Sequence, residues 1–280
     1  MKERSGEAKT SRSGSAGGGE NPWVILVDVG NTNAVFGVYQ GEELVCSFRL
    51  STTLERTADE YLSLLSPLFE HAEIDPGAAR AVVISSVVPP LHFTLERLSE
   101  RLFGCRPHFI DGSTDTGLEL DYDHPTEIGA DRIVNALAAR ELYGSPVVVV
   151  DFGTATTFDV VDRLGRYIGG LITPGLQISS EALFSRASRL YRVEIVKPKE
   201  LVGTNTGAAM QAGLYYGYLG QIDGILERLI REMDGSPKIV ATGGLASLLA
   251  GGSRYLEKVD QMLTLSGLRL IYERNRRQWA

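Results

Sequence analysis

The stretch that decides the fold reads Asp28-Val29-Gly30-Asn31-Thr32-Asn33, and it follows the apolar run Val24-Ile25-Leu26-Val27. A near copy recurs in the second half, where Val147 to Val150 lead into Asp151-Phe152-Gly153-Thr154-Ala155-Thr156-Thr157. In both copies an apolar stretch resumes directly after the turn. A strand, a tight turn of acid, glycine and hydroxyl or amide residues, and a second strand therefore occur twice. This repeat predicts two related domains that hold a nucleotide triphosphate between them.

Composition restricts the class of protein. The chain has 280 residues, 43% of them hydrophobic and 22% charged, which suits one large or two medium globular domains. A formal net charge of −7 argues against nucleic acid or an anionic membrane as the main partner. Cys46 and Cys105 lie far apart and outside metal-ligand spacing, which is typical of reduced thiols in a cytoplasmic protein. No apolar run approaches the roughly 20 residues that span a bilayer.

The chain is expected to divide into three parts. Residues 1–22 are mostly small, polar or charged, so we expect a disordered N-terminal extension. It lacks the apolar central region of a secretory signal. An N-terminal domain should cover residues 23–145 and a C-terminal domain residues 146–280, with the boundary near Ser145-Pro146. Strands that open each half, with helices packed outside them, indicate two α/β domains with mixed sheets.

Hydrophobic periodicity gives the expected elements. In the first half we expect strands at 24–27, 35–39, 44–50, 81–86 and 108–110, and helices at 53–70, 91–103 and 129–143. In the second half we expect strands at 147–150, 158–161, 167–172 and 238–241, and helices at 176–188, 205–233 and 264–274, with a short helix after Gly244. Thr52 or Thr53 is expected to cap the first helix, and Gly144 to end the third.

The residue types in the two turns suit phosphate binding. Gly30 and Gly153 can take φ > 0 and let the backbone approach a ligand closely. Backbone N–H groups of such turns form an anion-binding concavity, to which hydroxyl and amide side chains add donors. Carboxylates beside a polyphosphate would repel it, so Asp28 and Asp151 imply bound cations such as Mg²⁺. An Asp-Gly pair can also simply close a β-turn, but two matched turns after apolar strands favour the phosphate interpretation.

Other nucleotide-binding motifs do not occur. The sequence contains no Gly-x-x-x-x-Gly-Lys-Ser/Thr, and no Gly-x-Gly-x-x-Gly opens a helix after a strand. The protein-kinase signature set is also missing. The P-loop, Rossmann and protein-kinase classes therefore have no support.

A second candidate site lies in the segment from Tyr122 to Arg132. It places Asp131 and Arg132 in the first turn of a predicted helix. The helix dipole stabilises an acid there whatever its function. The pair also suits a reaction in which Asp131 accepts a proton from a substrate hydroxyl while Arg132 binds a carboxylate or phosphate.

Taken in order, these segments resemble the type III pantothenate kinase family. The matching segments are Asp28 to Asn33, Ser86-Val87-Val88-Pro89, Gly129-Ala130-Asp131-Arg132, Asp151 to Thr157, Gly169-Gly170-Leu171-Ile172-Thr173-Pro174-Gly175, Asn205-Thr206 and Ala241-Thr242-Gly243-Gly244-Leu245. They follow the family's order and cover nearly everything from Val24 to Arg274. Together they are far more specific than any one of them alone.

The resemblance implies a fold, a reaction and a set of site residues. The fold would be two actin-like domains of the ribonuclease H-like, sugar-kinase type, with mixed sheets flanked by helices and ATP in the cleft between them. The reaction would be ATP-dependent phosphorylation of pantothenate to 4'-phosphopantothenate, the first step of coenzyme A biosynthesis, in a cytoplasmic homodimer. Asp131 matches the general base, and Asp151 the ligand of a monovalent cation, K⁺ or NH₄⁺. Expected ATP-binding residues are Asp28, Val29, Gly30, Asn31, Thr32, Asn33, Ala34, Val35 and Thr154. Expected pantothenate-binding residues are Tyr122, Gly129, Ala130, Asp131, Arg132 and Thr206.

Two other functions stay open at this point. Another small-molecule kinase of the same superfold would share the fold, since fold alone does not fix the acceptor. A non-catalytic ATP-binding regulatory protein is the second, although the retention of Asp28, Asp131 and Asp151 argues against it. Homodimer formation has weaker support from the residues. Small residues on the helix 205–233 permit close approach of a second helix, but tight packing inside one domain explains them equally well: Gly207, Ala208, Ala209, Ala212, Gly213, Gly217 and Gly220.

Overall fold

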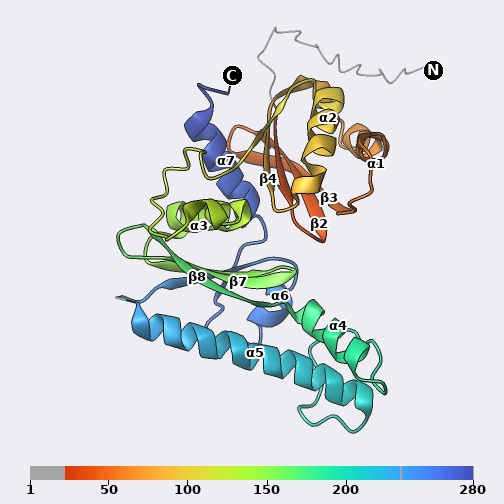
Figure 1. Cartoon of the computed structure of the whole chain (residues 1–280), viewed down its shortest axis with the longest axis vertical. Coiled ribbons are helices and arrows are strands. Elements are labelled where there is room, and N and C mark those ends of the chain that lie inside the picture. The colour runs from red at the N-terminus through yellow and green to blue at the C-terminus, as the bar shows by residue number, and fades with distance from the viewer. Residues whose placement is uncertain (1–22, 234, 280) are drawn as a thin grey trace, which may run out of the picture.

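The protein was analysed as a computed structural model, which describes residues 23–233 and 235–279. The expected N-terminal extension, residues 1–22, lies outside the described residues. Two five-stranded sheets are stacked with two helices between them, and further helices cover the outer faces (Figure 1). Within the described residues, none of the helices has the length and apolar character that would cross a membrane.

The first sheet is mixed and has the order β3-β2-β1-β4-β5. Its strands are β1 (Trp23–Val29), β2 (Asn33–Gln40), β3 (Glu43–Ser51), β4 (Ala79–Ser86) and β5 (Pro107–Phe109). Strand β1 is antiparallel to β2 and parallel to β4. The central strand β1 is almost wholly buried, as a run of branched apolar residues requires.

The second sheet repeats this topology strand for strand, with the order β10-β9-β6-β7-β8. Its strands are β6 (Val147–Phe152), β7 (Ala155–Val161), β8 (Tyr167–Pro174), β9 (Lys238–Thr242) and β10 (Lys258–Val259). Asp28 pairs with Val35 on the neighbouring antiparallel strand, and Asp151 pairs with Thr157 in the same way. The internal repeat read from the two turns is therefore confirmed as a repeat of structure.

The helices form layers around the sheets. Helices α1 (Ala58–His71) and α2 (His92–Leu102) pack on the outer face of the first sheet, and α3 (Ala130–Tyr143) and α7 (Leu263–Asn275) lie between the sheets. Helix α5 (Thr206–Glu232) runs along the outer face of the second sheet beside α6 (Ala246–Ala250), and α4 (Leu176–Arg186) projects beyond the end of that sheet. The described residues also contain three short 3₁₀ turns: Pro76–Ala78, Pro89–Leu91 and Pro125–Glu127.

The layer of α3 and α7 joins the two halves into one core. Leu26 from the first sheet and Val149 from the second both belong to the buried cluster built on these helices. The helices approach closely at Gly267, where an added Cβ would lie 2.3 Å from the carbonyl oxygen of Val134. Helix α7, from the second half of the chain, thus packs against the first sheet. The position of the second half therefore depends on contacts with the first half.

Most expected elements form, and the differences have local causes. Helix α1 begins after Thr57, because Thr57 and Glu60 form a reciprocal capping box. The expected cap at Thr52 or Thr53 is wrong, since β3 extends to Ser51 and the Thr52 hydroxyl donates to the carbonyl of Gly30 at 2.7 Å. Gly144 ends α3 with φ +83° as expected. Strand β10 was not predicted, because two residues carry no periodic signal.

Candidate nucleotide and substrate site

The two turns meet in space. The hydroxyl groups of Thr32 and Thr154 are joined by a hydrogen bond of 2.8 Å between their Oγ1 atoms. Both turns follow the central strand of a sheet, and the two strands end at a shared cleft of about 260 Å³. The cleft brings together nine of the expected residues: Asp28, Gly30, Asn31, Thr32, Asn33, Val35, Asp131, Asp151 and Thr154.

Two expected ATP-binding residues contribute no side chain to the cleft. Val29 and Ala34 are 1% and 0% exposed and pack in the core under α1 and α2. Alternation along a strand places every second side chain on the opposite face, which explains why neighbours in one motif separate. Only the backbone of these two residues is available to a ligand.

The glycines of the two turns are required because a Cβ would be crowded there, not because the backbone adopts a positive φ. Neither Gly30 nor Gly153 has a positive φ, so the expectation that they use the left-handed region is wrong. An added Cβ at either residue would lie 3.3 Å from a carbonyl oxygen of its own turn. Gly243 does have φ +89°, and a Cβ there would lie 2.5 Å from Oδ1 of Asp151. A Cβ at Gly129 would lie 2.6 Å from Oδ1 of Asp131. These last two glycines leave room for the carboxylates.

Three carboxyl groups interact across the cleft. Burial, followed by the charges of Asp131 and Asp151, raises the pKa of Asp28 to about 8, while Arg49 acts in the opposite direction. Burial and the charges of Asp131 and Asp159 raise the pKa of Asp151 to about 7. Burial also raises the pKa of Asp131, although its carboxylate accepts the backbone N–H of Arg132 at 2.8 Å. Without a counter-charge the site disfavours full ionisation.

The donor set suits a cation that is shared with a ligand. No group of three or more His, Cys, Asp or Glu side chains in the described part of the chain could hold a metal ion by itself. Mg²⁺ is commonly held by one or two carboxylates together with substrate phosphates and water. Asp28 and Asp151, with raised pKa values and oxygen donors, fit that pattern.

Asp151 is oriented by a chain of two hydrogen bonds from residues on two helices. The Asn135 side chain, 1% exposed, donates from Nδ2 to Oδ2 of Asp151 at 3.1 Å. The hydroxyl of Thr264 on α7 donates to Oδ1 of Asn135 at 2.8 Å. Asn135 follows Asp131 by four residues, so one face of α3 serves two of the acids.

A second cluster of polar groups surrounds Arg132, which is 8% exposed. Its Nε donates to Oδ1 of Asp159 at 2.7 Å, and the Tyr167 hydroxyl donates to the same oxygen at 3.1 Å. Its Nη2 is buried and has no hydrogen-bond partner among the described residues. The ring of Tyr122 lies 6.1 Å from that of Tyr167. An anionic ligand group would satisfy the unpaired Nη2 of Arg132.

Of the other expected substrate residues, two lie at this site and one does not. Gly129 is the N-cap of α3 and Ala130 its first residue, directly before Asp131. Thr206 begins α5 and lines a separate surface hollow with Leu183 and Met210, not the cleft of the turns. The structure therefore does not bring Thr206 to Asp131 within one chain.

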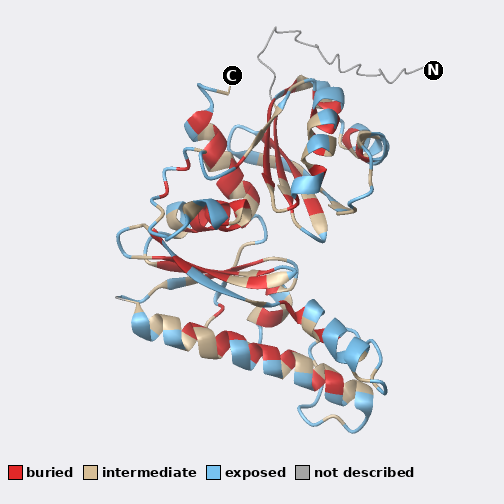
Figure 2. Cartoon of the chain, viewed as in Figure 1, coloured by how far each residue is buried: buried red, intermediate tan, exposed pale blue. Residues whose placement is uncertain are grey.

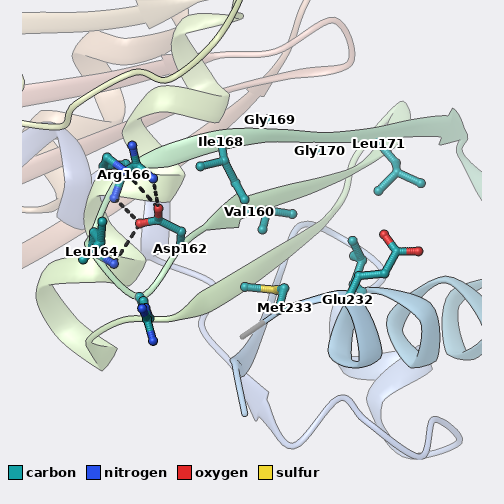
Figure 3. A pocket seen from close by; sticks show the side chains of 12 residues that line it. Val160, Asp162, Leu164, Arg166, Ile168, Gly169, Gly170, Leu171, Glu232 and Met233 are labelled. Carbon is teal, nitrogen blue, oxygen red and sulfur yellow. Dashed lines mark hydrogen bonds and ion pairs between the residues drawn. The ribbon is translucent and has the colours of Figure 1, made fainter. Parts of the chain in front are cut away.

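The cleft of the two turns is not the most spacious hollow on the protein, so size alone would not select it as the functional site. A hollow of about 520 Å³ lies between β8 and the end of α5 and is larger than the cleft (Figure 3). Half of its lining residues are apolar, and two of its four charged residues, Asp162 and Arg166, pair with each other at 2.7 Å. No expected site residue lines it, so we assign the chemistry to the smaller, acid-lined cleft.

Comparison with known proteins identifies the family. Residues 24–228 match the family model described as type III pantothenate kinase. A protein of that name from Geobacter sulfurreducens is 53% identical, over 90% of this chain and 99% of its own length. One from Myxococcus xanthus is 54% identical, over 90% of this chain and 98% of its own. The chain belongs to the type III pantothenate kinase family. The similarity extends across both phosphate turns and α3.

Solved structures agree on the fold. A Campylobacter jejuni protein described as a conserved putative Baf family transcriptional activator has a TM-score of 0.56 at 23% identity, over 90% of this chain and 99% of its own. An activator of 2-hydroxyisocaproyl-CoA dehydratase from Clostridium difficile, solved with bound ADPNP, has a TM-score of 0.53 at 13% identity, over 91% and 97%. At these identities the likeness concerns the fold alone. The expected actin-like α/β fold with two mixed sheets is confirmed.

The sequence interpretation missed polar residues near the cleft, and three of them bear on its chemistry. Arg49 and Thr264 line its inner part, and Asn135 binds Asp151. Asn135 could have been found from its spacing of four residues after Asp131 on a helix. Arg49 and Thr264 come from segments without a motif, and only strand pairing and helix packing bring them here.

The raised carboxyl pKa values predict how stability depends on pH. Between about pH 4 and 8 the folded protein holds a proton on Asp28 that the unfolded chain releases, so stability falls as pH rises through this range. In chelator and without nucleotide, we expect Asp28→Asn to melt at least a few degrees above wild type at pH 8.5, and close to it at pH 4.5. Differential scanning calorimetry at the two pH values checks this. A variant that melts below wild type at pH 8.5 would contradict the assignment.

Proposed function

We propose that this chain catalyses ATP-dependent phosphorylation of pantothenate to 4'-phosphopantothenate, the first step of coenzyme A biosynthesis. The observation that carries the proposal is the contact of Thr32 with Thr154, which joins the two turns beside Asp131. Membership of the type III pantothenate kinase family indicates that pantothenate is the acceptor of the phosphoryl group. We further propose that residues 23–145 and 146–280 are the two domains that close on ATP, and that the enzyme is cytoplasmic.

The turns position the triphosphate. In-line phosphoryl transfer requires mainly alignment and stabilisation of charge. Backbone N–H groups and the side chains of Asn31, Thr32 and Thr154 supply donors on both sides of the cleft. Asp28 would hold Mg²⁺ and Asp151 a monovalent cation, K⁺ or NH₄⁺. When bound, these ions neutralise phosphate charge and let both carboxyl groups ionise.

Asp131 is the proposed general base. It lies at the start of α3 and lines the cleft beside Asp28 and Asp151. Its raised pKa makes it a better proton acceptor near neutral pH than an ordinary aspartate. In the reaction its carboxylate takes the proton of the primary hydroxyl of pantothenate as that oxygen attacks the γ-phosphorus, while the bond from the γ-phosphorus to the bridging oxygen breaks and ADP leaves.

The Arg132 cluster is the proposed pantothenate site. The unpaired Nη2 of Arg132 suits the pantothenate carboxylate, since an arginine donor binds a carboxylate more strongly than a neutral group. Asp159 and Tyr167 hold the guanidinium in place, and Tyr122 covers Tyr167 from outside. Gly129 and Ala130 connect this site to Asp131.

A direct assay tests the function. Purified protein should release ADP from Mg·ATP in the presence of pantothenate, and the rate should rise when K⁺ or NH₄⁺ replaces a bulky organic cation. A panel of sugars and acetate serves as the comparison, because related kinases share this fold. ADP release with one of those acceptors but not with pantothenate would remove the proposal, as would ATP binding without turnover.

Replacement of Asp131 by Asn should stop turnover while ATP binding stays near normal. Loss of a general base typically costs roughly 10²–10⁴ in rate. The measurement is kcat by coupled assay, beside the Kd of a non-hydrolysable ATP analogue. Retained turnover would exclude Asp131 from this role.

The carboxylate of pantothenate can be tested through the substrate, with no change to the protein. Pantothenyl alcohol keeps the attacked hydroxyl but lacks the carboxylate that Arg132 would bind. We expect its kcat/KM to fall by about tenfold or more, since a charge-assisted hydrogen bond contributes roughly 1.5–3 kcal/mol. Equal kcat/KM for both compounds would place the carboxylate elsewhere.

We also propose a homodimer built on α5. Five small residues follow one exposed face of this helix at helical spacing: Thr206, Ala209, Gly213, Gly217 and Gly220. A Cβ at Gly213, Gly217 or Gly220 would meet nothing within 4 Å, so packing inside the chain does not explain these glycines. Figure 2 shows exposed segments along the length of α5. Ala212, in contrast, is buried.

A second copy would also resolve the position of Thr206. Thr206 lies outside the cleft of its own chain, so a role in pantothenate binding requires it to reach the cleft of another copy. Exposed apolar residues near the start of α5, including Leu201 and Val202, would be covered in such a dimer.

Gly217→Glu tests the dimer. A Glu side chain has room in the single chain but would place charge in a helix–helix contact, so we expect the variant to sediment as a folded monomer at micromolar concentration. Leu64→Glu, at an exposed position of α1, is the control and should sediment as wild type. A wild-type protein that sediments as a monomer would contradict the dimer.

A further inference from the structure

The cleft of the phosphate turns has an inner extension. A smaller hollow of about 140 Å³ continues from it and shares five lining residues with it: Asp28, Val35, Arg49, Asp151 and Gly243. Residues from β3, β9 and the start of α7 complete its wall. The shared residues mark the junction of the two hollows, and one of them is a cation.

Arg49 is the only Lys or Arg among the residues that line either hollow. Three aspartates line the same space, so the protein groups carry a marked excess of negative charge. ATP brings several further negative charges, and Mg²⁺ offsets only part of them. A cation at this junction therefore faces the part of the cleft where the protein's own negative charge is concentrated.

Strand register fixes where Arg49 stands. Asp28 on β1 pairs with Val35 on β2, and Val35 pairs with Arg49 on β3. Directly paired residues project from the same face of a sheet, so the three side chains form one row across the strands. Strands lie roughly 4.8 Å apart, which puts Arg49 about 10 Å from Asp28 along the row. An extended arginine can span much of that distance toward the first turn.

The guanidinium is available for a ligand. Arg49 is exposed and forms no hydrogen bond or ion pair with any residue of the described part of the chain. Its strand is nevertheless anchored to the first turn, because the hydroxyl of Thr52 donates to the carbonyl of Gly30 at 2.7 Å. The side chain can move while its backbone stays in register with the turn.

We propose that Arg49 is a nucleotide-binding residue whose guanidinium contacts phosphate oxygens of ATP on the Asp28 side of the cleft. The inference rests on the proposed function. Arg132, the other arginine near the site, is buried against Asp159 and lines neither hollow. The two arginines thus divide the anions between them, with phosphate at Arg49 and the substrate carboxylate at Arg132.

Steady-state kinetics test the assignment. Arg49→Gln should raise the KM for ATP about tenfold or more, the size expected for loss of a charge-assisted hydrogen bond, and change the KM for pantothenate less than threefold. Arg49→Lys should recover part of the loss, since it keeps the charge but not the planar fork. Arg97→Gln, which removes an exposed arginine of α2, is the matched control and should leave both KM values unchanged. An ATP KM within twofold of wild type in Arg49→Gln would overturn the proposal.

A binding cycle separates direct contact from an effect through Asp28. Calorimetry measures the Kd of the protein for the Mg²⁺ complex of a non-hydrolysable ATP analogue. Four proteins are compared: wild type, Arg49→Gln, Asp28→Asn and the double variant. Direct contact predicts that Arg49→Gln weakens binding also in the Asp28→Asn background. No further loss there would show that Arg49 acts only through Asp28 and would overturn the proposal. This measurement needs no turnover, so a failed pantothenate assay would remove the proposed function and leave the binding result interpretable.

Discussion

The cleft is constrained by the crowding of three carboxyl groups at one point, which the rest of the structure has to hold in place. Asp28 and Asp151 are the next-to-last residues of the central strands of two sheets, and Asp131 lies in the first turn of a helix between those sheets. Burial raises the pKa of all three groups, and neighbouring carboxylate charges raise the pKa values of Asp28 and Asp151 further, which costs stability when the protein has no cation or nucleotide. The surrounding structure must therefore be rigid enough to hold the groups together. The same arrangement makes the cleft receptive to a cation-bearing polyphosphate.

Rigidity comes from the layer between the sheets. Helices α3 and α7 share one buried cluster with both sheets, and they approach so closely that Gly267 has no room for a Cβ. Asn135 and Thr264, one from each helix, extend this layer to Asp151 by hydrogen bonds. Packing far from the cleft thus sets the orientation of a carboxylate inside it. Helix α7 therefore contributes to the cleft through Thr264 as well as to the buried core between the sheets.

The two arginines near the cleft lie in different environments, so each suits a different anionic group. Arg132 is buried, paired with Asp159 and left with its Nη2 group unpaired, which suits a single carboxylate in a fixed place. Arg49 is exposed and unpaired within the described chain, which suits a flexible and more highly charged phosphate group. A kinase that binds two anionic substrates side by side needs such a division, because one shared cation would not distinguish them.

The sequence by itself determined the repeat, the elements and most of the cleft. Local signals carry this information: apolar runs fix the buried strands, and the turns and the first residues of α3 follow at fixed spacing, so Asp28, Asp131, Asp151 and Thr154 could be named in advance. Only the tertiary structure decided which of these residues face the cleft. Val29 and Ala34 turn into the core because side chains alternate along a strand, and Thr206 lies on a separate surface because α5 carries it away. Arg49 enters the cleft only through strand register, and Thr264 only through helix packing. Such contacts join segments distant along the chain, and no local pattern of residues records them.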